Sequence, residues 1–180
     1  MANFNGKFES TLQDWETPSS LFNYLNDLFL FDIDLAASDK NKKCSVFFSE
    51  SNDAMKHEWK GSCWLNPPYG SKGHKLKDWV IKSWNESRKD KCTIVLLIPA
   101  RTNTEWWHDY CMKANEIYFI RGRPKFNNST HGLPQPLAII VFRKDSTPTI
   151  LKSIDMKQVL ALDHQRTHET EYRPQSMSPL

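Results

Sequence analysis

Apolar residues recur along the chain with the periods expected of helices and buried strands. Helical spacing predicts helices at 18–29, 74–89 and 103–113. Short apolar runs predict strands at 31–35, 62–65, 92–98, 116–120 and 137–142. Because helices alternate with strands, the pattern predicts an α/β fold with a mainly parallel sheet and flanking helices.

Both ends of the pattern carry recognisable signals. Thr17 and Pro18 precede the first predicted helix as a typical N-cap and first helical residue. After Asp145 the pattern weakens to one amphipathic helix at 150–162 and a polar tail. With 180 residues the chain has about the length of one domain. We therefore expect a single domain with short tails.

Composition excludes several classes of protein. Apolar residues make up 39% of the chain and charged residues 25%, which is typical of a globular domain and not of a disordered chain. No apolar run approaches the roughly 18 residues of a membrane span, and the polar start does not resemble a secretory leader. We therefore expect a cytoplasmic protein with no membrane partner.

No metal site is expected from the pattern of potential ligands. The four cysteines form no CxxC pair, and reduced thiols are their expected state. His164 and His168 have the spacing of only half a zinc-finger motif, in a polar segment.

Charge is distributed unevenly, since residues 61–144 carry an excess of Lys and Arg while both flanks are net acidic. A basic middle fits a surface that meets a polyanion such as DNA or RNA. Scattered, solvated lysines explain the same count equally well.

The candidate chemistry lies in Asn66-Pro67-Pro68-Tyr69, directly after the strand predicted at 62–65. Ligands of α/β sheets usually bind where strands end. The Asn66 side-chain oxygen and the Pro67 carbonyl can both accept hydrogen bonds from a planar exocyclic amine, and Tyr69 can stack on the planar group. A tight turn that contains two prolines and an aromatic residue is the structural alternative.

Several further segments, in order and spacing, extend the pattern around this loop. They are Trp15-Glu16-Thr17-Pro18, FDIDLAAS at 31–38, WLNPPY at 64–69, LIPARTNT at 97–104 and RGRPKF at 121–126. With these segments the chain resembles the phage-type DNA N6-adenine methyltransferases, a compact Dam-like family of phages and prophages. The resemblance implies a Rossmann-like methyltransferase fold, S-adenosylmethionine as methyl donor, and methyl transfer to N6 of a flipped adenine in DNA.

The resemblance also implies how the chain is organised. It covers 15–143 as the methyltransferase domain, which leaves an N-terminal extension at 1–14 and a C-terminal helix and polar tail at 144–180. Protection of phage DNA from host restriction is the biological use that the family suggests.

Roles for individual residues follow from the same resemblance. Asn66, Pro67 and Tyr69 would hold the adenine, and Pro68 would shape the loop. No GxG sequence follows the first strand, so small residues such as Ala36 would have to let the donor approach closely. Asp32 is a further acidic candidate beside the donor. The candidate donor-binding residues are Trp15, Thr17, Pro18, Asp34, Ala36 and Asp53.

Residues that would contact DNA flank the site in sequence. Loops after the strands would bring several basic residues to one face, where phosphate contact is the expected role and one arginine could read a base. Phe126 could cover the second face of the flipped base, or it could lie in the core. The full set is Lys72, Lys75, Arg101, Arg121, Arg123, Lys125 and Phe126. The expected partner is duplex DNA with a short recognition site.

Two alternatives stay open. An Asn-Pro-Pro-Tyr loop also occurs in methyltransferases that act on RNA amines or on a protein glutamine, because any planar amine needs the same acceptors. A DNA-binding relative that has lost turnover is the non-enzymatic alternative. The intact Asn66 and Tyr69 argue against the second, since a binding module has no need of that loop.

Overall fold

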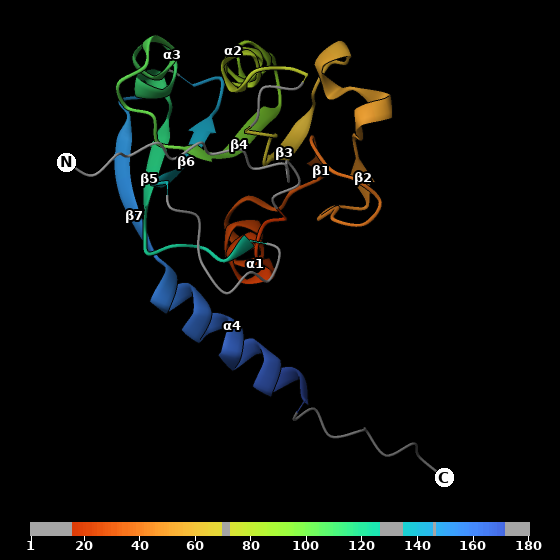
Figure 1. Ribbon diagram of the computed structural model, residues 1–180, viewed down its shortest axis with the longest axis vertical. Coiled ribbons are helices and arrows are strands. Elements are labelled where there is room, and N and C mark those ends of the chain that lie inside the picture. The colour runs from red at the N-terminus through yellow and green to blue at the C-terminus, as the bar shows by residue number, and fades with distance from the viewer. Residues whose placement is uncertain (1–15, 70–72, 127–134, 146, 172–180) are drawn as a thin grey trace, which may run out of the picture.

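The computed structural model describes residues 16–69, 73–126, 135–145 and 147–171. Within them lies a seven-stranded sheet of order β2-β1-β3-β4-β6-β5-β7 (Figure 1). The strands are β1 (Ile33–Asp34), β2 (Val46–Phe47), β3 (Gly61–Leu65), β4 (Cys92–Pro99), β5 (Glu116–Arg121), β6 (Leu137–Phe142) and β7 (Ile150–Asp155). The helices are α1 (Ser19–Phe29), α2 (Leu76–Ser87), α3 (Glu105–Asp109) and α4 (Met156–Glu171), with short 3-10 turns η1 (Glu50–Asn52), η2 (Ala54–Lys56) and η3 (Cys111–Lys113).

The sheet is mainly parallel, as the sequence predicts. Strand β6 is antiparallel to both neighbours, β4 and β5, and every other neighbouring pair is parallel. Strand β3, helix α2 and strand β4 form a βαβ unit, since β3 and β4 pair in parallel. Since β4 and β5 both oppose β6, they run in the same direction, and β1, β3, β4 and β5 therefore end at one edge, called the carboxyl edge below.

Two apolar layers sandwich the sheet. Strand β4 is buried along most of its length, and its side chains alternate between the layers: Leu96 packs with α2 and α3, whereas Val95 and Leu97 pack with α1. Figure 1 shows α2 and α3 on one side of the sheet and α1 on the other. Leu21 and Leu25 anchor α1 and are fully buried. The α/β, Rossmann-like prediction is confirmed.

The prediction of a helix at 150–162 was wrong for its first half. Residues Ile150–Asp155 form β7, which pairs in parallel with β5 and continues the sheet past the last predicted strand. Four of its six residues are exposed, so no alternation of apolar and polar positions reveals the strand. Helix α4 begins only at Met156, where the Asp155 carboxylate accepts a hydrogen bond from the Lys157 amide at 2.9 Å. Figure 1 shows α4 extending away from the sheet.

Two local predictions also need correction. The helix predicted at 103–113 is split into α3 and η3, because Tyr110 leaves helical geometry between them. Pro18, not Thr17, occupies the N-cap position of α1, and no side chain caps this helix. The Thr17 hydroxyl has a different partner, described below.

Candidate functional site

Asn66 and its neighbours lie at the carboxyl edge, between β3 and β4. The register pairs Leu65 of β3 with Leu96 of β4, which places Asn66 beside Leu97. Arg101 follows the end of β4 at the same edge. The sheet thus places the candidate loop where the sequence predicts it.

The Asn66 carboxamide is held at both of its ends. Its Nδ2 donates a hydrogen bond to Thr17 Oγ1 at 3.0 Å, and its Oδ1 accepts one from the Tyr69 hydroxyl at 2.8 Å. The same hydroxyl lies 2.9 Å from the Leu97 carbonyl oxygen. A phenol has one proton, so Tyr69 shares it between two acceptors. Three residues from three segments, Thr17, Tyr69 and, through Tyr69, Leu97, therefore fix one small polar group.

The rest of the loop is firmly packed. Pro67 is buried, and the partly buried Tyr69 ring contacts the apolar layers on both sides of the sheet. Burial raises the pKa of the Tyr69 phenol well above its usual value. The hydroxyl consequently keeps its proton, and its capacity to donate a hydrogen bond, at any physiological pH.

Asp34, the acidic residue at the end of β1, is buried and bonded to its own loop. Its carboxylate accepts hydrogen bonds from the amides of Ala36 at 3.3 Å and Lys43 at 3.0 Å. Burial raises the pKa of Asp34, and these two bonds together with the Lys43 charge act in the opposite direction. Lys43 also forms an ion pair with Glu16 at 3.0 Å, which brings the segment before α1 to this loop. Asp34 therefore shapes the backbone around Ala36.

Asp53 lies in front of η2 and is more accessible than Asp34. Its carboxylate accepts a hydrogen bond from the Met55 amide at 3.1 Å, and both of its oxygens lie 3.2 Å from His74 Nε2. Burial acts to raise the pKa of Asp53, but the contacts with His74, the Met55 amide and Lys56 outweigh it and hold the pKa below its usual value. Because His74 follows the candidate loop in sequence, this contact links Asp53 to that loop.

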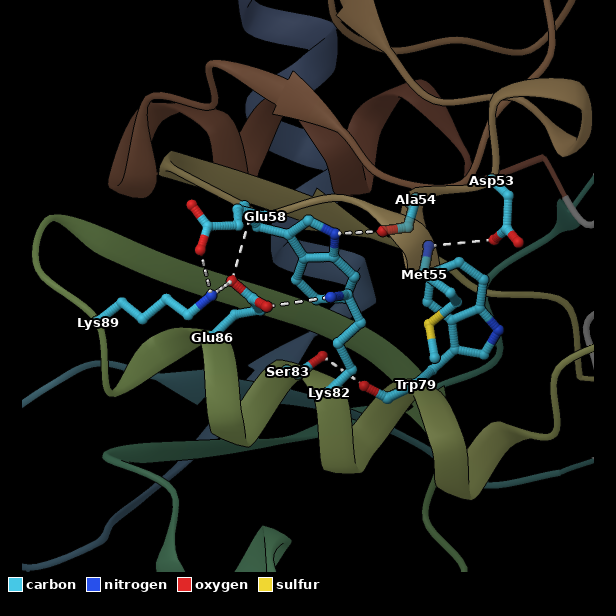
Figure 2. Close-up of polar contacts among 10 residues, drawn as sticks. Asp53, Ala54, Met55, Glu58, Trp79, Lys82, Ser83, Glu86 and Lys89 are labelled. Atoms are coloured by element: carbon cyan, nitrogen blue, oxygen red, sulfur yellow. Dashed lines mark hydrogen bonds and ion pairs between the residues drawn. The ribbon is translucent and has the colours of Figure 1, made fainter.

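A polar cluster around Glu86 holds the Asp53 segment against α2 (Figure 2). The Glu86 side chain is only 7% exposed; it accepts from the Trp59 amide at 3.1 Å and pairs with Lys82 and Lys89 at 3.0 Å each. The Trp59 indole donates to the Ala54 carbonyl at 2.9 Å, within η2. Figure 2 shows these contacts running from Lys89 along α2 toward Asp53. The position of Asp53 thus depends on a buried carboxylate.

Asp32 lies away from this site. Its Oδ2 accepts a hydrogen bond from the Ser62 amide at 2.7 Å, at the start of β3, whereas Asn66 follows the end of that strand. The structure therefore places Asp32 at the opposite edge of the sheet, and it does not join the other candidate residues.

The basic candidates within the described residues are exposed. Arg101 follows β4 and Lys75 precedes α2, while Arg121, Arg123 and Lys125 are at or after the end of β5. The topology thus brings the ends of β4 and β5, with their arginines, to the carboxyl edge. Trp15 and Lys72 lie outside the described residues.

Gly122 allows the chain to turn sharply between two of these arginines. Its φ is +101°, which side chains rarely adopt, and an added Cβ would lie 3.2 Å from Met156 Cβ at the start of α4. The exposed Arg121 guanidinium lies 3.6 Å from Asp155. The turn therefore carries the chain past α4 and toward Arg123.

Phe126 lies in the core. Its side chain is fully buried in the apolar layer on the α1 side of the sheet, together with Trp64 and Leu137. Of the two roles that the sequence left open for this ring, the structure favours packing over contact with a base.

Two members of the site were not recognised from the sequence in the roles that they have here. Thr17 contacts Asn66 across 49 positions of sequence, and the Leu97 partner of Tyr69 is a backbone carbonyl. No local pattern signals either contact. The only available signal was the strand pairing, which places β3 and β4 side by side.

Comparison with known proteins finds a matching family model and related phage proteins. The family model described as DNA N-6-adenine-methyltransferase (Dam) matches residues 7–159. A protein of Escherichia phage T1 named DNA N-6-adenine-methyltransferase is 33% identical over 109 residues, which are 59% of this chain and 44% of that protein. A protein of the same name from Haemophilus phage HP1 is 31% identical over 122 residues, 64% of this chain and 68% of the relative.

A third relative is bacterial. The putative methyltransferase YfdM of Escherichia coli K12 is 35% identical over 63 residues, which are 31% of this chain and 69% of that protein. The chain thus spans less than half the length of the T1 relative and about two thirds of the other two. Among the described residues, none of the helices has the length and apolar character that a bilayer span requires.

Proposed function

Because the chain belongs to the DNA N-6-adenine-methyltransferase family, we propose that it transfers the methyl group of S-adenosylmethionine to N6 of adenine in DNA. The observation that carries the proposal is the Asn66 carboxamide, held at the carboxyl edge with its oxygen directed to the Tyr69 hydroxyl. Because the Tyr69 hydroxyl also lies 2.9 Å from the Leu97 carbonyl, it can release the Asn66 oxygen, which can then accept a hydrogen bond from an exocyclic amine.

The residues at this edge fit a sulfonium nucleoside donor in their chemistry. Such a donor carries an ammonium group and two ribose hydroxyls, and these need acceptors. Asp53 has a partly exposed carboxylate, and Asp34 holds the loop that contains the small residues Ala36 and Ala37. We assign Asp53 to a polar group of the donor and Asp34 to the shape of the donor loop. The donor supplies an electrophilic methyl group.

The amine of adenine is a poor nucleophile because its lone pair is delocalised into the purine ring. Hydrogen bonds from this amine to Asn66 Oδ1 and the Pro67 carbonyl would draw the nitrogen toward tetrahedral geometry and localise the pair. The base must first leave the duplex, at a cost of about a few kcal/mol in stacking. The Tyr69 ring would stack on the extruded base. After transfer, the excess proton on N6 passes to solvent.

Contacts with DNA would come from the basic residues of the carboxyl edge. Arg101, Arg121 and Arg123 are exposed; Arg121 is the last residue of β5, and the other two follow strands that end at this edge. Their charge supports phosphate binding beside the extruded base. We further propose that the substrate is a duplex with a short recognition site read by the loops of this edge.

The rate of methyl transfer by the Asn66→Ala variant, compared with that of the wild-type protein, tests the role of the Asn66 loop. We expect methyl transfer to unmethylated duplex DNA to be abolished, while donor binding, measured by calorimetry, stays within about twofold, since the donor candidates lie on other loops. Asn85→Ala, an exposed change on α2, is the matched control and should transfer at the wild-type rate. A wild-type rate in Asn66→Ala would remove this residue from the reaction. Transfer to RNA or to protein in place of DNA would favour the alternative substrates.

A further inference from the structure

Thr17 is buried, and its hydroxyl does not cap the helix that it precedes. Its residue is 3% exposed, and the N-cap position of α1 belongs to Pro18. The Thr17 hydroxyl oxygen instead accepts the hydrogen bond from Asn66 Nδ2 at 3.0 Å. A residue whose local pattern predicts helix capping is thus used for a contact within the site.

The contact matters because a carboxamide has two chemically opposite ends. Only its oxygen can accept a hydrogen bond from an amine, and rotation by half a turn exchanges oxygen and nitrogen with little change of shape. When Oδ1 of Asn66 binds an amine, Nδ2 necessarily points the other way and needs an acceptor, since the group is partly buried. Thr17 Oγ1 is an acceptor in that position.

The hydrogen bond at the oxygen end of the carboxamide can be released. At rest, the Tyr69 hydroxyl donates to Asn66 Oδ1, but it has a second acceptor, the Leu97 carbonyl, at 2.9 Å. Tyr69 can therefore give up Oδ1 to an incoming amine and keep a full hydrogen bond to Leu97. Thr17 has the opposite task, because its bond to Nδ2 has to persist while the amine is bound.

We propose that Thr17 is a positioning residue that holds the Asn66 carboxamide in its reactive orientation, with Nδ2 bound to the Thr17 hydroxyl and Oδ1 presented to the adenine amine. The inference rests on the proposed function and gives Thr17 a task separate from donor binding. Thr17 acts through Asn66, and its loss removes an acceptor of Nδ2 without removing the group that binds the amine.

The test compares Thr17→Val, which removes the hydroxyl and keeps the shape, with Thr17→Ser, which keeps the hydroxyl. We expect Thr17→Val to slow single-turnover methyl transfer at saturating donor and DNA by about 10- to 100-fold, the effect of one hydrogen bond that matters in the transition state. Thr17→Ser should stay within about threefold of wild type, and donor affinity should change by less than about twofold in both. Thr93→Val, at the start of β4 and away from the carboxyl edge, is the matched control and should not change the rate.

A second readout separates positioning from base extrusion. DNA with 2-aminopurine at the target position reports extrusion by fluorescence, and this base has no amine at C6 for Asn66 to bind. We expect the same fluorescence increase with Thr17→Val as with the wild-type protein. Should Thr17→Val fail to fold, Thr17→Ala removes the hydroxyl with a smaller side chain and must show the same loss of rate.

Several outcomes would overturn the inference. These are a wild-type rate in Thr17→Val, equal losses in the Val and Ser variants, or weaker donor affinity with an unchanged rate at saturation. The last would make Thr17 a donor contact, as the sequence alone suggests. Failure of the wild-type protein to methylate DNA would instead contradict the proposed function, so the two failures are distinguishable.

Discussion

Replacing Tyr69 by Phe should destabilise the protein without slowing methyl transfer. The change removes one oxygen atom and keeps the ring that would stack on the base. The lost hydroxyl binds Asn66 Oδ1 at 2.8 Å and the Leu97 carbonyl at 2.9 Å. The first of these bonds has to be given up when an amine binds, so the reaction does not depend on it.

The size of the effect follows from the two acceptors. A hydrogen bond contributes about 1 kcal/mol net, and a buried acceptor left without a partner costs about 1–3 kcal/mol. Leu97 is fully buried and Asn66 partly so. We therefore expect a loss of about 2 kcal/mol in the free energy of unfolding. For a chain of this size the melting temperature should fall by roughly 4–8 °C.

Urea denaturation gives the stability, and single-turnover transfer at saturating donor and DNA gives the rate. Tyr110→Phe is the matched control, since Tyr110 is also partly buried but packs against Trp84, away from the loop. A Tyr69→Phe protein as stable as wild type would refute the stabilisation assigned to the two hydrogen bonds of the Tyr69 hydroxyl. A rate reduced more than about tenfold in a folded variant would show that the hydroxyl takes part in the transition state.

Other parts of the account make separate predictions. Burial acts to raise the pKa of Glu116, but Lys152, Tyr118 and Arg143 lower it to about 2. The folded-state pKa of Glu116 therefore lies below the unfolded value of about 4.3. The stabilisation by the charged Glu116 is thus complete above about pH 4.5 and is lost as the pH falls toward 2. Glu116→Gln should flatten the dependence of unfolding free energy on pH across that window. Phe126→Ala should cost about 3–5 kcal/mol in urea denaturation, and a loss below about 1 kcal/mol would contradict its place in the core. Alanine at both Arg121 and Arg123 should weaken DNA binding and reduce the slope of log Kd against log salt by about 1 per phosphate contact, and an unchanged slope would remove these residues from the DNA surface.

Most of the fold could be predicted because its elements bury one or both faces. The uninterrupted apolar run of β4 and the helical spacing in α2 leave a clear periodic signal. Strand β2 has only two residues, and Val46 is largely exposed. Strand β7 has four exposed residues of six. Such edge strands form because a neighbouring strand has unpaired backbone groups, which no pattern of side chains within the segment reveals.

The site was predictable to the extent that it follows strand ends. Asn66 and Asp34 come directly after or at the end of strands that run in parallel, so their placement at one edge follows from the fold. The contact between Thr17 and Asn66 does not, because it joins residues 49 positions apart through the packing of α1 on the sheet. Asp32 was considered a candidate because it lies close to Asp34 in sequence. It lies at the amino end of the strand, however, whereas Asp34 lies at the carboxyl end.

The most direct test of the central claim is to incubate the protein with S-adenosylmethionine, labelled in its methyl group, and unmethylated duplex DNA, and then to digest the DNA to nucleosides. Label in N6-methyldeoxyadenosine is the result that the Asn66 loop predicts. Label in a modified cytosine, or none in DNA while the donor binds, would contradict it.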